Sequence, residues 1–513
     1  MFHHLQVAAK LRLTQMQIRS DQAVRMETLL NFPVPAHSTA VLRICLGTAL
    51  SFWAAHYLWS GRAHLLCSTE VMHFTWPGLS RITPPGEVGV TLLFGLIGVA
   101  GLLLAIGAAA RVAAGLAAAG FTWFFLIDQT SYQNHYYLIL LLCWICVFVP
   151  VNRVWSFDAT EYRLQPQMPA AGLWLLRFHV GLPYVFGGLS KIDPEWLSGQ
   201  SMRLLLADRF NLAADSVQAV QGGLLLAWGG MAFDLLIVPA LMHRTTRLVA
   251  LPALLIFHLT NSSLFPIHIF PWFMLAASTI FFPPDWPVRL LCRRSVIPAA
   301  DIVPGALTAL APPPQPPEFS RLLLLTAACW CLLQLLLPLR HLAIPGDASW
   351  TEQGHFFGWR MMLRGKTAEV HFLATRPADG YSWLADHSRL LHQEQLARFT
   401  IDPDMIRQTA TAIARLHQAR TGEQIEVRAL ALASLNGRPP ALLIDPDIDL
   451  ADPALPVHTA WILPRPPASE QLWRHPPGDW ITRVPLPDRW QTLVRPARNT
   501  PKTEVTSVNQ IPE

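Results

Sequence analysis

The feature that most restricts the fold of this sequence is a series of long apolar segments with few charged residues. A helix of roughly 20 apolar residues crosses a bilayer. Segments 247–260 and 265–283 are so closely joined that one of them could be re-entrant, so eight or nine transmembrane helices are expected. The candidate segments are 41–59, 88–108, 112–128, 136–152, 173–190, 222–242, 247–260, 265–283 and 321–338.

The composition agrees with a membrane protein and argues against nucleic-acid binding. The chain has 513 residues, of which 52% are hydrophobic and 14% are charged, whereas soluble proteins carry roughly 25% charged residues. Its 19 Trp and 25 Phe suit membrane interfaces, where aromatic rings are enriched. The net charge of +5 is small for this length, and no basic face is visible of the kind that nucleic acid requires.

Arginine and lysine predict the orientation of the helices, because cytoplasmic loops carry an excess of these residues. If the N-terminal segment is cytoplasmic, the inner loops contain most of the loop arginines, and the short outer loops contain few. The segment 191–221, with Lys191, Arg203 and Arg209, is the exception. An odd number of spans then places the chain after residue 340 on the outer side.

The sequence changes character after residue 340. The stretches TAEVHFLATRP and IEVRALALASL show the alternation that is typical of strands, and DPDMIRQTATAIARLHQAR has the spacing of an amphipathic helix. We therefore predict a mainly α-helical integral membrane protein followed by a smaller, β-rich α+β domain outside the cytoplasm. The expected parts are a cytoplasmic N-terminal segment (1–40), a polytopic membrane domain (41–340), the extracytoplasmic domain (341–496) and a flexible tail (497–513).

Neither a redox site nor a metal site is indicated. Cys143-Trp-Ile-Cys146 forms a CxxC pattern, but it lies inside an apolar segment, where a cysteine is usually a small hydrophobic residue. The histidines form no HxxH or HxxxH pair with a carboxylate partner on one helix face. No metal cofactor is therefore expected.

Polar residues from distant parts of the chain fall on the same predicted membrane face, the outer one. Ionisable residues near the membrane interior are costly and often mark a functional site. Scattered solvation of helix ends would not predict such convergence, so a site on the outer face is expected. The residues that share this face are Asn134, His135, Lys191, His258 and Asn261, together with the segment 350–366.

Taken singly, each of these residues has a structural alternative. Lys191 could be a lysine whose charged end reaches the membrane surface from an apolar helix. His135 and His258 could be hydrogen-bonded residues at helix ends. Asp234 and Arg177 lie within spans and could form a structural buried pair.

Six motifs of this chain resemble the vitamin K-dependent γ-glutamyl carboxylase family and its bacterial relatives, whose membrane part is a horizontally transferred transmembrane domain. They occur in family order and with similar spacing over roughly residues 40–450. A single motif would be weak, but six in order are specific. The motifs are TSYQNHYYL (130–138), GGLSKIDPEWLSGQSM (187–202), FHLTNSSLFPIHIF (257–270), WTEQGHFFGWRMML (350–363), DMIRQTATAIARL (404–416) and LNGRPPALLIDPDIDL (435–450).

The resemblance implies an enzyme that carboxylates glutamate side chains with reduced vitamin K, O2 and CO2. Lys191 occupies the position of the family's catalytic lysine, which would deprotonate the vitamin K hydroquinone. O2 would then convert the quinol anion into an alkoxide base and finally into the epoxide. That base would remove the glutamate γ-proton, and the carbanion would attack CO2. A lysine is a base only when its amine is neutral, and an apolar helix end favours the neutral form.

The resemblance also implies roles for residues around this lysine. Asn134 and His135 match an Asn/His pair at the carboxylation centre, where both side chains could donate hydrogen bonds to developing negative charge. Phe265, Met361 and Met362 match positions associated with the quinone pocket, although simple core packing is the alternative for such apolar residues. The residues expected to bind quinone or substrate are His258, Asn261, Phe265, Ile269, Trp350, Arg360, Met361 and Met362.

Three departures from the family pattern keep other functions open. Arg360 stands where animal carboxylases usually carry an acid, Ser190 replaces the first of two lysines, and Cys67 has no cysteine partner in the C-terminal region. A quinol epoxidase or monooxygenase without protein carboxylation therefore remains an alternative, as does a non-enzymatic lipid-binding or transport protein.

The expected partners are membrane lipid and a glutamate-containing protein or peptide, with or without a propeptide. The resemblance to bacterial members places the protein in a bacterial inner membrane. The outer domain and the site would then face the periplasm.

Overall fold

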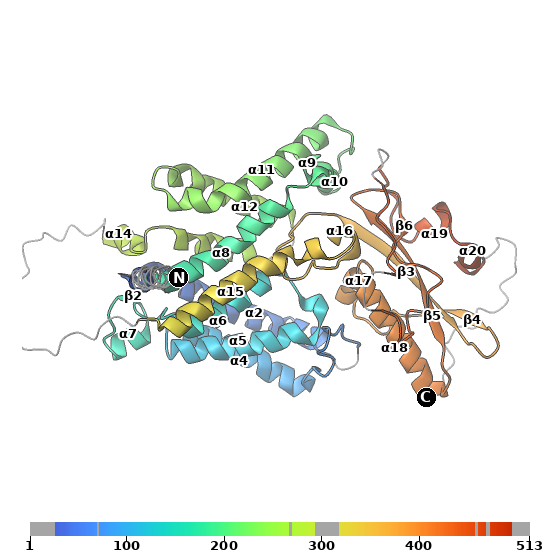
Figure 1. Ribbon diagram of the computed structural model, residues 1–513, viewed down its shortest axis with the longest axis horizontal. Coiled ribbons are helices and arrows are strands. Elements are labelled where there is room, and N and C mark those ends of the chain that lie inside the picture. The colour runs from blue at the N-terminus through green and yellow to red at the C-terminus, as the bar shows by residue number, and fades with distance from the viewer. Residues whose placement is uncertain are drawn as a thin grey trace, which may run out of the picture.

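The computed structural model describes residues 26–68, 71–265, 269–292, 318–456, 460–467 and 472–494. Figure 1 shows the membrane helices gathered on one side and the strands of the C-terminal region on the other. The predicted tail at 497–513 and most of the predicted N-terminal segment at 1–40 lie outside the described residues.

Six helical stretches of the described chain are long and apolar enough, by length and composition, to cross a membrane. Two further apolar stretches are shorter, namely α6 (Asn134–Phe148) and α13 (Phe270–Ala277) with the 3-10 turn η2 (Ser278–Phe281). α8 (Ala170–Ser190) covers the predicted segment 173–190, and Arg177 within it lowers its hydropathy. The predicted helical membrane class is therefore confirmed. The six long stretches are α2 (His37–Trp59), α4 (Gly86–Ile106), α5 (Ala110–Ile127), α11 (Val217–Met242), α12 (Arg247–Leu264) and Arg321–Ala343, which comprises α15 (Arg321–Leu339) and η3 (Arg340–Ala343).

Short elements connect the membrane helices. Two of them, β1 and β2, pair antiparallel and tie the chain before α2 to the chain before α8. The connecting elements are β1 (Pro33–Pro35), α3 (Arg62–Leu66), η1 (Gln129–Ser131), α7 (Phe157–Glu161), β2 (Gln167–Pro169), α9 (Pro194–Leu197), α10 (Gln200–Arg209) and α14 (Trp286–Cys292).

Glycines let the membrane helices approach each other closely, as small residues commonly do in membrane proteins. A Cβ atom on Gly47 of α2 would overlap the Gly101 carbonyl oxygen of α4. A Cβ atom on Gly188 of α8 would lie 2.7 Å from the Leu235 side chain of α11. The second contact brings α11 against the end of α8, where Lys191 lies.

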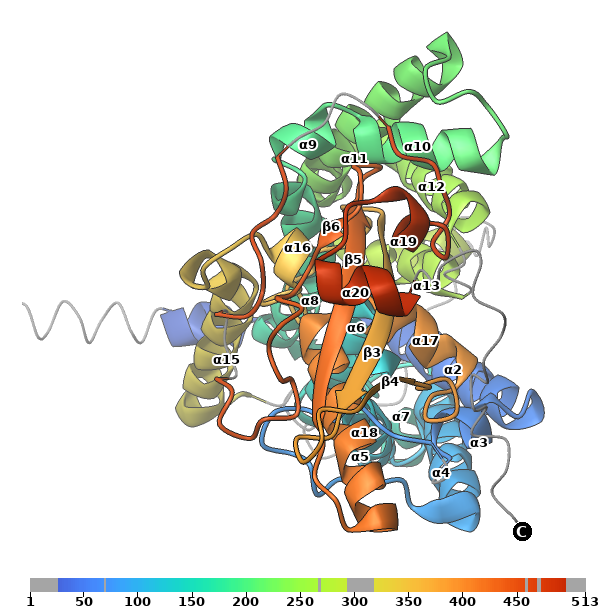
Figure 2. The same ribbon diagram turned by 90° about the vertical axis from the view of Figure 1, so that its right-hand side faces the viewer.

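The C-terminal region, residues 344–494, contains a four-stranded antiparallel sheet in the order β4–β3–β5–β6. The long strands β3 (Lys366–Thr375) and β5 (Glu426–Leu435) coincide with the two stretches predicted as strands. The predicted amphipathic helix is α18 (Pro403–Thr421), whose apolar face shares a buried core with the sheet (Figure 2). A smaller region with strands thus follows the membrane helices, as predicted. Its other elements are α16 (Ala348–Thr351), β4 (Ser382–Ala385), α17 (Gln393–Phe399), β6 (Ala441–Leu442), α19 (Trp480–Arg483) and α20 (Asp488–Val494).

One segment of the C-terminal region, residues 352–364, packs among the membrane helices. Trp359 is fully buried in the apolar core of the membrane part, and its ring centroid lies 5.1 Å from that of Tyr137. The rings of Phe357 and Trp76 lie 5.2 Å apart. The two parts of the protein therefore meet through this segment, which we call the inserted loop.

Candidate functional site

A cavity of about 850 Å³ lies where the inserted loop meets the ends of the membrane helices. A volume of this size holds a ligand as large as a cofactor. Its apolar lining comes mainly from α11 and α12, whereas its cationic lining comes from the inserted loop, β3 and α17. The apolar residues include Leu225, Leu226, Phe233, Ile256, Phe257 and Leu264, and the cationic residues besides Lys191 are Arg360, Arg364, Lys366 and Arg398.

The position of Lys191 in this cavity follows from where α8 ends. Pro194 disfavours continuation of the helix, and Asp193 instead caps α9 by accepting from the Glu195 and Trp196 amides at 2.9 and 3.1 Å. The Trp196 ring then covers the lysine, with its centroid 5.5 Å from Lys191 Nζ. Lys191 is only 7% exposed, so its side chain lies inside the protein. This burial disfavours the alternative of a lysine that reaches the membrane surface.

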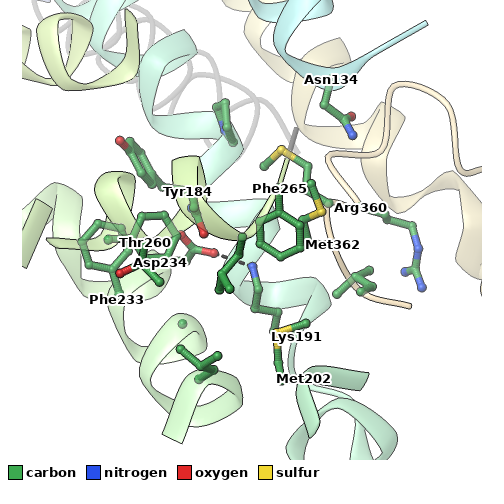
Figure 3. A pocket seen from close by; sticks show the side chains of 18 of the residues that line it. Asn134, Tyr184, Lys191, Met202, Phe233, Asp234, Thr260, Phe265, Arg360 and Met362 are labelled. Atoms are coloured by element: carbon green, nitrogen blue, oxygen red, sulfur yellow. Dashed lines mark hydrogen bonds and ion pairs between the residues drawn. The ribbon is translucent and has the colours of Figure 1, made fainter. Parts of the chain in front are cut away.

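Lys191 forms a buried ion pair with Asp234 of α11. Lys191 Nζ lies 2.5 Å from Asp234 Oδ2 (Figure 3). It also donates to the Gly187 carbonyl at 3.3 Å. Gly187 leaves room for this approach, because a Cβ atom there would lie 3.3 Å from Asp234 Oδ2. The alternative that Asp234 pairs with Arg177 is wrong, since Arg177 donates to two backbone carbonyls at the end of η2.

Asn134 and His135 begin α6 and lie in the wall of the same cavity. The Tyr132 hydroxyl donates to Asn134 Oδ1 at 2.8 Å and accepts from the Phe357 amide of the inserted loop at 2.7 Å. His135 stacks on Phe270 with 4.9 Å between the ring centroids. Because the Asn134 amide oxygen already has a donor, its amide nitrogen is the atom that can donate to a bound anion.

His258 and Asn261 reach the cavity from α12. The Tyr184 hydroxyl of α8 lies 2.9 Å from His258 Nε2 and 2.8 Å from Ser278 Oγ. This chain of hydrogen bonds joins α8, α12 and η2 beside the cavity. It gives the buried imidazole a hydrogen-bond partner, as the structural alternative supposed, although His258 lies within α12 and not at its end. The His258 ring still borders the cavity.

The inserted loop supplies Arg360, Met361 and Met362 to the cavity wall. Four of its residues have φ between 53° and 62°, which is uncommon for residues other than glycine. Strained backbone persists only where the surrounding packing holds it, and it concentrates at functional sites. The four residues are Glu352, Phe357, Trp359 and Met362.

Glu352 neutralises part of the charge behind the cationic lining. Its carboxylate pairs with Arg364 and, at 3.2 Å, with Lys366. Burial alone would raise the pKa of Glu352, but the two cations hold it below its ordinary value. Burial and the neighbouring Arg364 lower the pKa of His355 to about 3, so this histidine is neutral at physiological pH. Glu352 thus pairs with two of the four cations, and the cationic lining stays net positive.

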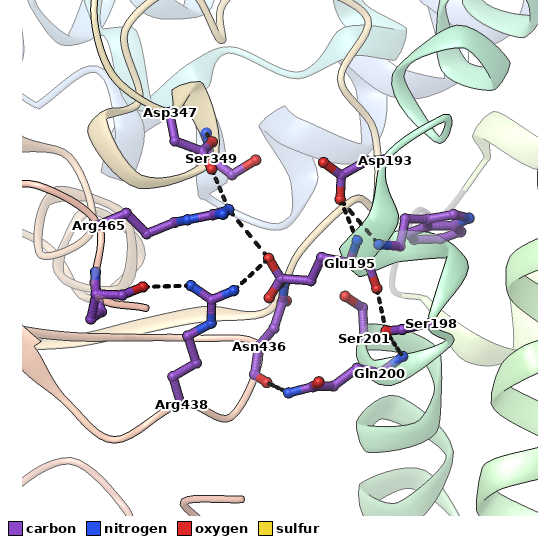
Figure 4. A network of polar contacts seen from close by, with 12 residues as sticks. Asp193, Glu195, Ser198, Gln200, Ser201, Asp347, Ser349, Asn436, Arg438 and Arg465 are labelled. Carbon is purple, nitrogen blue, oxygen red and sulfur yellow. Dashed lines mark hydrogen bonds and ion pairs between the residues drawn. The ribbon is translucent and has the colours of Figure 1, made fainter. Parts of the chain in front are cut away.

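Glu195 connects the segment after Lys191 to the C-terminal region (Figure 4). Its carboxylate accepts from the Asn436 amide at 2.9 Å and pairs with Arg438 at 3.0 Å and Arg465 at 3.3 Å. Glu195 lies four residues after Lys191 in the sequence. The network therefore anchors the turn that carries the lysine to loops more than two hundred residues away.

The structure brings nine of the eleven predicted site residues to the wall of one cavity and leaves two elsewhere. Ile269 packs against the apolar core of the membrane helices. Trp350 is buried in the core of the C-terminal region, where its indole donates to the Leu463 carbonyl at 2.8 Å. Apolar and aromatic residues in a motif serve packing as readily as binding, so their type could not separate the two uses. The nine are Asn134, His135, Lys191, His258, Asn261, Phe265, Arg360, Met361 and Met362.

Sequence reasoning missed several residues of the wall. Asp234 had one signal, because an acid inside a span is costly and calls for a partner. Arg398 and Tyr184 had none, since only the tertiary fold brings α17 and the middle of α8 to the cavity. Among the residues that the structure describes, no group of three His, Cys, Asp or Glu side chains could hold a metal ion.

These features define a polytopic membrane protein whose site lies between its transmembrane helices and a smaller α+β region. A family model described as the HTTM domain matches residues 31–286, and one described as the lumenal domain of vitamin K-dependent gamma-carboxylase matches residues 319–467. The chain therefore belongs to the γ-carboxylase-like family and is a membrane protein with a lumenal domain. This family implies a vitamin K cofactor and glutamate-containing substrates. No solved structure matches the chain.

Proposed function

We propose that the protein is a quinol-dependent γ-glutamyl carboxylase of a bacterial inner membrane. Residues 41–340 would form its catalytic membrane domain, and residues 341–496 its periplasmic domain. The observation that carries the proposal is a buried lysine–carboxylate pair, Lys191 with Asp234, in a cavity with both an apolar and a cationic lining. The family matches support the same reaction class.

The apolar lining suits a reduced quinone with an isoprenoid or phytyl tail. Leu225 of α11 and Ile256 of α12 line the cavity, yet they are 73% and 63% exposed. Gly229 and Gly230 also line it, and a Cβ atom on either would meet no atom within 4 Å. Since α11 and α12 are membrane-spanning candidates, these residues mark an opening toward lipid. A quinone dissolved in the bilayer could reach Lys191 by this route.

In this proposal Lys191 accepts the proton of a quinol hydroxyl. Lys191 must first release the proton that makes it an ammonium in the ion pair, because only the neutral amine accepts a proton. Asp234 then stabilises the ammonium that forms again, because an adjacent opposite charge favours the charged form. The Trp196 ring and the burial of Lys191 limit access of water to Nζ. Reduced vitamin K, when bound with O2, would supply a base strong enough to remove a glutamate γ-proton.

The cationic lining would hold the carboxylate of a substrate glutamate. Arg360 borders the cavity, and its Nε has no hydrogen-bond partner among the described residues. Arg360, which stands where animal carboxylases usually carry an acid, would therefore be a ligand for the substrate carboxylate. Asn134, through its amide nitrogen, and His135 would donate to the negative oxygen atoms of the new carboxylate. Glutamate and CO2 would arrive from the aqueous side, opposite to the quinone.

The test uses the full-length protein in lipid nanodiscs with reduced vitamin K, labelled bicarbonate and a glutamate-containing peptide. Epoxide and fixed label are measured in the same reaction. We expect the wild type to form both products and Lys191→Ala to lose both by about 100-fold or more, with partial recovery on addition of a small amine. Ser190→Ala is the matched control, because Ser190 precedes the lysine but does not line the cavity.

Each other outcome would change the conclusion. Undiminished epoxide formation by Lys191→Ala without added amine would refute the role of Lys191. Epoxide formation by the wild type without peptide-dependent fixation of label would favour a quinol epoxidase. The absence of oxygen uptake with reduced vitamin K would favour a lipid-binding or transport protein.

A further inference from the structure

A second and smaller chamber, of about 50 Å³, adjoins the cavity near the start of α6. Gln133 and Arg398 line both spaces, so the chamber lies next to the cavity. The rest of the chamber is largely polar and includes Arg62, His392 and the two hydroxyl residues Thr130 and Ser131. None of the residues assigned above to proton transfer or quinone binding belongs to it.

His392 lines this chamber and has a buried, unpaired ring nitrogen among the described residues. His392 is 6% exposed, and its Nδ1 accepts from the Glu394 amide at 3.2 Å. Burial lowers the pKa of His392, so the ring is neutral and its single proton must lie on Nε2. Among the described residues, Nε2 has no hydrogen-bond partner. A buried donor without an acceptor is costly and rare in folded proteins.

Arg62 adds a second unpaired donor to the same chamber. Its terminal NH2 group pairs with Glu394 at 3.0 Å, whereas its Nε is buried and has no partner within the described residues. The Glu394 side chain is 42% exposed and already engaged, so it does not satisfy the inner donors. The chamber is therefore lined by two permanent cations, Arg62 and Arg398, by the neutral ring of His392, and by one carboxylate, that of the partly exposed Glu394.

We propose that this chamber binds a small trigonal oxyanion and that the anion in the cell is bicarbonate. The N–H groups of His392, Arg62 and Arg398 can donate to its three oxygens. The chamber is too small for a carboxylate attached to a peptide, and a phosphate dianion would bring more charge against Glu394. Resting on the proposed carboxylase function, the chamber keeps bicarbonate next to the cavity when quinone and peptide occupy it, and the anion yields CO2 only after it leaves the chamber, takes up a proton and loses water. The proposal concerns binding, and no bond is made or broken in the chamber.

The experiment measures thermal unfolding of the full-length protein in nanodiscs at fixed pH and ionic strength. Bicarbonate is compared with nitrate, which has the same shape but cannot be incorporated, and with chloride. A ligand that binds only the folded state raises the unfolding temperature according to its concentration and dissociation constant. We expect bicarbonate and nitrate to stabilise the wild type and chloride to leave it unchanged.

Three variants test the donors. His392→Asn keeps an oxygen that can accept from the Glu394 amide but removes Nε2, and should weaken bicarbonate binding about tenfold. Arg62→Gln removes the other unpaired donor and should weaken binding in the same direction. Arg81→Met, at an exposed arginine outside the chamber, is the control and should bind bicarbonate as the wild type does.

The outcomes separate this proposal from the proposed enzyme activity. Equal stabilisation by chloride would overturn the chamber as an oxyanion site, and so would unchanged bicarbonate affinity in both donor variants. Stabilisation that depends on His392, in a protein that fixes no labelled carbon, would support the chamber and refute the carboxylase function. Carbon fixation without any anion-specific stabilisation would support the carboxylase function and refute the chamber as an oxyanion site.

Discussion

Replacing both members of the Lys191–Asp234 pair should cost less stability than the sum of the two single replacements. The two side chains lie 2.5 Å apart and are 8% and 6% exposed. Removing either one leaves a buried charge without its counter-charge, whereas removing both leaves no charge. The suitable substitutions are Lys191→Met, which keeps an unbranched chain, and Asp234→Asn, which keeps the shape of the carboxylate.

The magnitude follows from the geometry. At 2.5 Å and an effective dielectric constant of about 20, the Coulomb attraction is roughly 7 kcal/mol, much of which offsets the desolvation of the two groups. Each single substitution should therefore lower the free energy of unfolding by about 3–5 kcal/mol. The double variant should lose no more than one single variant, which gives a coupling energy of roughly 3 kcal/mol.

The assay is an SDS titration of all four proteins in mixed micelles, with unfolding followed by tryptophan fluorescence. A control cycle uses the exposed pair Asp285–Arg289, whose atoms are 2.7 Å apart but whose side chains are 32% and 69% exposed. Its coupling energy should stay below about 1 kcal/mol. Simple addition of the Lys191 and Asp234 losses, or a coupling no larger than that of the control, would refute the reasoning.

Three further predictions concern the surroundings of the site. Glu195→Gln should weaken its contacts with two arginines by about 2–3 kcal/mol and speed amide hydrogen exchange in the loops after β5; unchanged exchange would contradict an anchoring role. Burial alone would lower the pKa of His73, but its bonds to Asp128 and to a backbone carbonyl raise it above 6.5. The stability that protonated His73 contributes is therefore complete below pH 6.5 and is lost as pH rises through the folded-state pKa. The unfolding temperature of the wild type should fall more between about pH 6 and 8 than that of His73→Gln. Parallel curves for the two proteins would count against this role of His73. Gly188→Ala places a Cβ atom 2.7 Å from a leucine of α11 and should cost about 1–3 kcal/mol, whereas Gly229→Ala meets no atom within 4 Å and should be neutral or stabilising; equal effects in the same SDS titration would exclude close packing as the cause.

The elements that depend on local patterns were predictable from the sequence. Apolar length alone indicates a membrane helix, and each of the nine segments contains a helix or a pair of short helices, although only six of these stretches are long and apolar enough to cross a membrane. Alternation indicated β3 and β5, although both faces of these strands contribute to buried cores, with Phe372 of β3 in one core and Leu373 in the other. Residues at helix ends, such as Asn134 and Lys191, could also be placed together, since helices that cross the same membrane end at its two faces.

The contacts that complete the cavity could not be predicted, because they join residues that are distant in sequence. The pairing of Lys191 with Asp234 depends on how α8 rotates against α11, which Gly188 and Leu235 determine through packing. Arg177 lay within a span like Asp234, so charge alone made it an equally good partner. Trp350 shows a different limit of sequence reasoning. Its motif predicted a binding residue, but its burial in the C-terminal core accounts for a tryptophan at this position without a ligand.

The late position of the inserted loop in the sequence has a consequence for biogenesis. All membrane helices precede it, so they can enter the bilayer before residues 352–364 leave the ribosome. At that stage Lys191 and Asp234 have been synthesised, but the residues of the cationic wall and the partners of Glu195, Arg438 and Arg465, have not yet folded against them. Translation order therefore delays completion of the site until the last third of the chain has folded, which keeps an inserted but unfinished protein from closing around a ligand.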